Sequence, residues 1–189
     1  MTVANSVLRI VEETLPLIII FAVLELFTGG FLGNVVQQAS KMPGLLILVP
    51  GLLGLRGNIS SALGARIASG LHLGSIEPDK ISSGLKTNIA VSITLSIMLS
   101  LILSVLAWGV CSYSGGACMG LLNFVLVAVL TGFMSAIVLS FSTAGIAIMS
   151  YRKGLDPCNT TLPASASLGD IVTIIFLIVS VKIVMGLGI

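Results

Sequence analysis

The sequence predicts an all-α integral membrane protein with five transmembrane helices. Of its 189 residues, 56 % are hydrophobic and only 8 % are charged, whereas a soluble domain carries about 25 % charged residues. The apolar runs are long and continuous, which indicates helices rather than the alternating pattern of a transmembrane β-barrel. Because a span needs about 20 apolar residues, the chain is long enough for five helices with short loops.

The first two spans are predicted over residues 14–36 and 43–71. Pro16 lies at the start of the first span, where a proline fits the first turn of a helix. Pro50 lies inside the second span and leaves the carbonyl of Leu46 without its helical donor. In a membrane, such a carbonyl is tolerated where a neighbouring helix, water or an ion satisfies it.

Three further spans are predicted over residues 83–110, 119–151 and 161–185. The segments between the spans are short and polar, as in the charged loop 72–80. No connecting segment has the length of a soluble regulatory domain. Residues 1–189 are therefore expected to form a single five-helix transmembrane domain.

Basic residues near the span ends predict the orientation in the membrane. One side carries Arg9, Arg66, Lys80, Lys86, Arg152 and Lys153, and the other carries Lys41 and Lys182. Cytoplasmic loops are enriched in Lys and Arg. The N-terminus is therefore expected to be cytoplasmic and the C-terminus extracytoplasmic.

Cys111 and Cys118 flank a short loop that this orientation places outside. They can form a disulfide if the loop faces an oxidising space. They can equally be two small apolar residues at the ends of spans, and their spacing leaves both interpretations open.

Asp170 is an acidic residue inside the last span. Placing it at the centre of a lipid-exposed helix costs roughly 3 kcal/mol, so it is expected to face protein, water or an ion. Thr160, Pro163 and Ser167 share its helix face by spacing, and the carbonyl of Ala166 lies one turn before it. These oxygen donors suit a hard cation such as Mg²⁺, which keeps most of its waters and touches one or two carboxylates. The alternative is an aspartate that only hydrogen-bonds between packed helices.

The second span offers a partner face of small residues. Gly54, Asn58, Ser61 and Ala65 recur on one side of the helix. Such a stripe allows close helix packing, which is the more economical explanation of the glycines. Asn58 is different because its amide is polar, and the adjacent Gly57 exposes backbone.

Glu25 and Arg56 are two further charges inside predicted spans. Counted from opposite sides of the membrane, they reach a similar depth at about 1.5 Å per residue. We therefore expect a buried ion pair between them, in which removing one partner is more harmful than removing both. In the rival interpretation, Glu25 helps to attract cations.

The sequence does not predict an enzyme. It contains no HExxH motif, no histidine cluster and no phosphate-binding loop, and its single histidine, His72, cannot form a metal site alone. An intramembrane aspartyl protease would need two active aspartates, and the chain offers no second membrane-centre aspartate for Asp170, although a homodimer could supply one. The net charge of +2 also argues against a nucleic-acid partner.

Two motifs are specific when taken together. The first reads VPGLLGLRGN over residues 49–58, followed by LGARIASG over residues 63–70. The second consists of Leu155, Asp156, Pro157, Asn159, Pro163, Ser167, Leu168, Gly169, Asp170 and Thr173. Both resemble the transmembrane domain of the MgtE-type divalent cation transporters, in particular the eukaryotic solute-carrier magnesium transporter branch. The resemblance extends over the five-span length.

This resemblance implies a Mg²⁺ channel or transporter of the plasma membrane that works as a homodimer of five-helix units in the lipid bilayer. Asp170 matches the aspartate that binds hydrated Mg²⁺ in the pore on the two-fold axis, and Gly57 and Asn58 match the motif beside that pore. Ser167 and the carbonyl of Ala166 are expected to contact its water shell. Mn²⁺ and Co²⁺ are further candidates for the transported ion.

The sequence departs from the family pattern at three positions. Arg56 replaces the small residue of the bacterial proteins, Glu25 stands where a small residue is expected, and Cys158 replaces an acid. The bacterial amino-terminal and CBS domains have no counterpart here, so gating through them is not expected. Three alternatives therefore stay open: transport of another divalent cation, Na⁺-coupled Mg²⁺ exchange, and a membrane scaffold that transports nothing.

Overall fold

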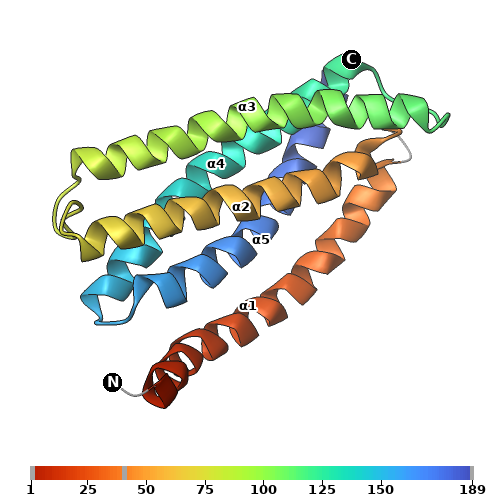
Figure 1. The fold of residues 1–189 in the computed structure, drawn as a ribbon. Helices are drawn as coiled ribbons and strands as arrows, with labels where there is room; N and C mark the ends of the chain where they lie inside the picture. Colours follow the sequence, from red (N-terminus) through yellow and green to blue (C-terminus); the bar gives the residue numbers. More distant parts are fainter. Residues whose placement is uncertain (1–2, 40–41, 188–189) are drawn as a thin grey trace.

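Five long helices joined by short turns make up the structure, a computed structural model that describes the backbone of residues 3–39 and 42–187 (Figure 1). The helices are α1 (Val3–Ala39), α2 (Leu45–His72), α3 (Ser83–Tyr113), α4 (Leu121–Arg152) and α5 (Pro157–Gly186). Within these residues, each helix contains a segment long and apolar enough to cross a membrane. This confirms the predicted all-α class with five spanning helices, and the chain is a multi-pass membrane protein.

Helix α1 begins earlier than the predicted first span. It starts at Val3 rather than near residue 14, and its polar first part contains an ion pair between Arg9 Nε and Glu13 Oε1 at 2.8 Å. Residues four apart are neighbours on a helix surface. The pair therefore supports helical structure before the apolar run begins.

Helix α5 also begins earlier than predicted, at Pro157 rather than near residue 161. The side chain of Asp156 accepts a hydrogen bond from the backbone N–H of Cys158 at 2.9 Å and so caps the helix. Proline fits the first turn because that turn has no helical acceptor for its missing N–H. These cap signals lie outside the apolar run on which the predicted span depends.

The core has two apolar ends and a polar middle layer. One apolar cluster includes Leu45, Leu48, Leu52, Phe124 and Val181, and the other includes Leu63, Ile67, Leu71, Leu85 and Ala147. The buried polar side chains of the middle layer include Arg56, Ser60, Ser96, Ser100, Ser135, Thr161 and Ser165. Helices α2 to α5 pack around these layers, whereas α1 packs mainly against α5 and only slightly against α2.

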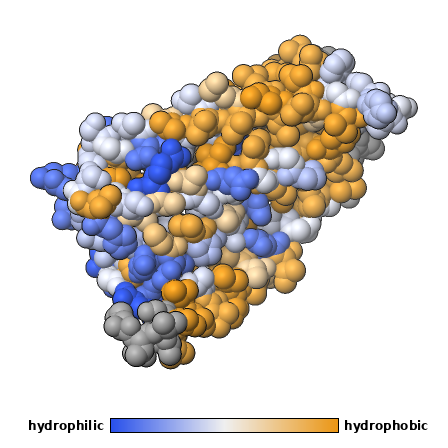
Figure 2. Space-filling model, viewed as in Figure 1, coloured by the Kyte–Doolittle hydropathy of each residue, from blue (hydrophilic) through white to orange (hydrophobic). Residues whose placement is uncertain are grey.

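The outer surface is largely apolar, as lipid contact requires. On α1, large side chains such as Leu26 and Phe27 are exposed. Figure 2 shows hydrophobic residues over much of one face and polar residues gathered at the end of the molecule that holds the α2–α3 turn. Polar patches also interrupt the apolar surface in the region of α2 and α5 (Figure 2).

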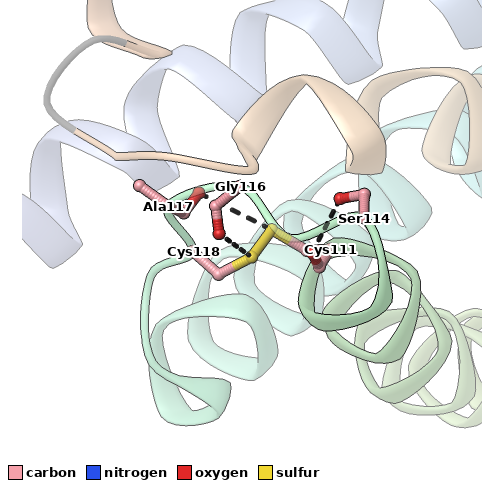
Figure 3. Close-up of a disulfide and its surroundings, with 5 residues drawn as sticks. All are labelled: Cys111, Ser114, Gly116, Ala117 and Cys118. Carbon is pink, nitrogen blue, oxygen red and sulfur yellow. Dashed lines mark hydrogen bonds between the residues drawn. A yellow bond between two sulfur atoms is a disulfide. The ribbon is translucent and has the colours of Figure 1, made fainter.

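A disulfide between Cys111 and Cys118 closes the α3–α4 turn, with Cα atoms 6.0 Å apart (Figure 3). It decides between the two interpretations that the sequence left open. The adjacent Met119 N–H donates to the carbonyl of Pro43 at 2.9 Å. Gly44 has a φ of 87° and approaches so closely that an added Cβ would lie 2.7 Å from Cys111 Sγ. The disulfide loop therefore packs against the start of α2.

Candidate cation site

Helices α2 and α5 approach each other closely where two glycines meet. A Cβ added to Gly169 would lie 3.5 Å from the backbone N of Gly57 and 3.6 Å from the carbonyl carbon of Arg56. The hydroxyl of Ser60 lies 3.0 Å from the carbonyl oxygen of Ser165, so it links the two helices one turn away. Small residues permit this approach of two backbones in a membrane protein.

The same contact continues along both helices. A Cβ added to Gly64 would lie 3.0 Å from Thr161 Cγ2. The face of α2 that packs on α5 thus includes Gly57, Ser60 and Gly64. The predicted partner face is a different one: on it, Gly54 and Asn58 are exposed, and Ser61 and Ala65 are half-buried. Within one copy of the chain, the small-residue stripe is therefore not the surface that packs on α5. Helix α2 contacts α5 through the adjacent face instead.

Asp170 follows Gly169 and is half-buried. Ala166 and Ser167, one turn before it, are also half-buried and lie on the same side of α5. The glycine contact brings this part of α5 beside Gly57, and the adjacent Asn58 side chain is exposed. The predicted site residues thus lie on partly exposed sides of two touching helices.

Glu25 of α1 is a further acidic group near Asp170. It is half-buried, and α1 packs along α5, the helix that carries Asp170. Like charges repel each other more strongly in a site of low dielectric than in water, so a cation near them would be favourable. Oxygen donors of this kind are the ligands that hard divalent cations take.

The predicted ion pair between Glu25 and Arg56 is wrong. Among the side chains that the structure describes, no ion pair joins them. Arg56 is 1 % exposed and points to α3, where Nη1 donates to Ser96 Oγ at 2.6 Å and Nη2 donates to Ser100 Oγ at 3.1 Å. Similar depth in the membrane does not make two residues neighbours, because α1 packs on α5 and Arg56 faces the other way.

Sequence reasoning missed the serines that hold Arg56. Ser92, Ser96, Ser100 and Ser104 recur every four residues along α3 and are all buried. Four-residue spacing places them on one helix face. This stripe was the signal in the sequence that could have identified the partner of the buried arginine.

Known proteins resemble the chain over most of its length. The model of the MgtE family, described as a divalent cation transporter, matches residues 49–180. Solute carrier family 41 member 3 of Rattus norvegicus is 29 % identical over 162 residues, which cover 82 % of this chain and 35 % of the relative. Member 2 of the same family in Homo sapiens is 26 % identical over 157 residues, covering 79 % of this chain and 27 % of the relative.

The chain thus spans about a third or less of the length of these relatives. The family match nevertheless covers more than half of the chain and includes the α2–α5 contact and Asp170. A family of transporters also agrees with the expectation that the protein is not an enzyme. The chain belongs to the MgtE family of divalent cation transporters.

Proposed function

We propose that this chain forms the membrane pore of a Mg²⁺ transporter, in which two copies hold a hydrated ion between their Asp170 side chains. The observation that carries the proposal is the contact between Gly57 and Gly169. It gathers the acid of α5 and the Gly57–Asn58 segment of α2 at one partly exposed surface. The description of the family as a divalent cation transporter supports the same conclusion.

The donor chemistry favours Mg²⁺ over softer ions. Asp170, Asn58, Ser167 and the carbonyl of Ala166 offer only oxygen atoms as ligands. Mg²⁺ prefers oxygen and gives up its waters reluctantly, whereas thiolate and imidazole favour Zn²⁺ and related metals. The ion is therefore proposed to keep its water shell, which Asn58, Ser167 and backbone carbonyls contact. Glu25 supplies additional negative charge near the site.

The exposure of the site supports a homodimer. Asp170 is only half-buried and Asn58 is exposed, although each lies near the middle of a candidate membrane span. Polar groups that face lipid are costly. A Cβ added to Gly54 would meet nothing within 4 Å, so this side of α2 has space for a close neighbour. A second copy related by two-fold symmetry would cover both helices and double the number of carboxylates.

The proposed location of the protein is the plasma membrane. In the proposed orientation, its N-terminus lies in the cytoplasm. The distribution of basic residues supports this orientation. The disulfide supports it independently, because such bonds persist on the oxidising side of a membrane. That side carries the α3–α4 turn.

Mg²⁺ uptake into liposomes that contain the purified chain tests the proposal. Asp170→Asn keeps the shape of the side chain and removes its charge. We expect its uptake to fall to that of protein-free liposomes, with an unchanged elution volume in detergent. Asp79→Asn, an exposed acid in the α2–α3 turn, is the matched control and should transport normally. Uptake by Asp170→Asn at the rate of the control would disprove the proposed site.

A further inference from the structure

A second group of side chains of the types that bind metals lies at the start of α5. His72 is the last residue of α2, Asp156 is the N-cap of α5, and Cys158 lies in its first turn. One ligand atom from each residue can be chosen so that all three lie within 4.8 Å of one another. His72 Nε2 and Asp156 Oδ1 are 3.4 Å apart. All three residues are at least partly exposed, so an ion can reach them from water.

Neighbouring residues hold these ligands in place. The ring of His72 packs edge-on against Tyr151, with ring centres 5.9 Å apart. Asp156 receives the N–H of Cys158, and its own N–H donates to Glu13 Oε2 at 3.3 Å. The cluster is thus assembled from the end of α2 and the start of α5, with support from α1 and α4. A metal site depends on such supporting contacts as well as on its ligands.

The three ligand types point to a different class of ion from Mg²⁺. A thiolate, an imidazole and a carboxylate are the usual ligands of Zn²⁺. Tetrahedral bonds of about 2.0–2.3 Å put such ligands about 3.3–3.7 Å apart, so a bound ion would need only small rotations of the exposed His72 and Cys158 side chains. A thiolate is a poor ligand for Mg²⁺. Three protein ligands leave the fourth position to water.

We propose that His72, Asp156 and Cys158 bind a transition-metal ion of the Zn²⁺ and Co²⁺ class. The site is separate from Asp170, which lies about 18 Å further along α5 at 1.5 Å per residue. The bound ion joins the end of α2 to the start of α5, the two helices that also meet at Gly57. This binding does not depend on which ion crosses the membrane.

The disulfide makes the test selective, because Cys158 is the free cysteine of the chain. The rate at which a maleimide modifies Cys158 is measured on the purified full chain by mass spectrometry. Zn²⁺ at ten times its dissociation constant should slow the reaction about tenfold, since only the metal-free fraction reacts. The same concentration of Mg²⁺ should leave the rate unchanged. Equal protection by Mg²⁺, or none by Zn²⁺, would overturn the proposal.

Two variants identify the ligands. His72→Gln retains the reactive thiol, and the Zn²⁺ concentration that it needs for protection should rise at least about tenfold. Asp79→Asn removes an exposed acid of the neighbouring turn that lies outside the cluster, and it should be protected like the wild type. Zn²⁺ protection that is unchanged in His72→Gln would show that the histidine is not a ligand.

Co²⁺ gives an independent readout of the metal–sulfur bond. Bound to a thiolate, it acquires a near-ultraviolet charge-transfer absorption. The wild-type chain should show this band upon Co²⁺ addition, and Cys158→Ser should not. A wild-type protein without the band, or a variant that keeps it, would contradict a thiolate ligand.

Discussion

At the scale of single residues, Arg56 is a fully buried cation without an ion-pair partner among the described side chains. Helices α2, α3 and α4 contain no acidic residue, and Arg56 Nε has no hydrogen-bond partner. A cavity of about 10 Å³ beside it, lined also by Ser92 and Ser140, has room for one water molecule. Because a desolvated charge is costly unless it is hydrogen-bonded, the serines of α3 are expected to stabilise the fold.

Replacement of Ser96 by alanine tests this expectation. Ser96 accepts the shortest hydrogen bond of Arg56, at 2.6 Å. A hydrogen bond to a charged group contributes about 1.5–3 kcal/mol, so Ser96→Ala should lower the free energy of unfolding in detergent by about that amount. Thr94→Ala, on the exposed side of the same helix, should change it little. Equal stability of the two variants would show that the serine does not hold the arginine.

At the scale of helices, α4 contributes a glycine to the packing around Arg56. A Cβ added to Gly132 would collide with Ser100 Oγ and would lie 2.9 Å from Arg56 Nη2. The absence of a side chain on α4 therefore makes space for the hydrogen bond between α2 and α3. Gly145, on the exposed side of α4, would meet nothing within 4 Å.

These two glycines form a matched pair for a stability measurement. Alanine in a helix interior is favoured over glycine by roughly 0.5–1 kcal/mol, so Gly145→Ala should raise the melting temperature slightly. Gly132→Ala gains the same helix propensity but displaces Ser100 from the arginine, and it should melt at a lower temperature than the wild type. A similar rise in melting temperature for both variants would mean that Gly132 is not needed to make space for Ser100 and Arg56.

At the scale of the whole molecule, the bundle is asymmetric. Helices α2 to α5 share buried layers, whereas α1 packs mainly on α5 and exposes large apolar side chains. Asp170 and the small-residue stripe of α2 lie on partly exposed sides. Lipid is a suitable neighbour for the apolar side chains of α1 but a poor one for a carboxylate. A second copy is therefore proposed at the α2–α5 surface.

Cross-linking in membranes tests this dimer. In a Cys158→Ser background, Asn58→Cys places one free thiol on the proposed interface. A short bifunctional maleimide should join two such chains into a covalent dimer visible on a denaturing gel. Thr94→Cys, on the exposed face of α3, should remain monomeric under the same treatment. Equal cross-linking of both positions would argue against a specific interface at α2.

Hydropathy predicted the spanning helices because each span must be apolar along most of its length. Helix starts were less predictable, because α1 and α5 continue beyond the apolar runs through the Arg9–Glu13 pair and the Asp156 cap. The disulfide could not be decided from spacing alone. Its formation depends on how the α3–α4 turn brings the two cysteines together.

The candidate site was predictable only in part. Position along a helix predicts the approximate depth of each polar residue in the membrane. It does not predict which side of each helix packs against which neighbouring helix. For that reason Arg56 was paired with Glu25 instead of the α3 serines, and Gly54 was expected in the contact that Gly57 makes. The proximity of Glu25 to Asp170 likewise required the packing of α1 on α5.

The buried arginine also has a consequence for the synthesis of the protein. Arg56 stands near the middle of α2, which is the least apolar of the five candidate spans, and an arginine there costs roughly 3 kcal/mol during insertion. Its hydrogen-bond acceptors are on α3, which the ribosome makes later. When α2 first reaches the membrane, it therefore lacks the groups that satisfy its charge. The stable unit of insertion is expected to be the α2–α3 hairpin, in which the serines enter the bilayer together with the arginine.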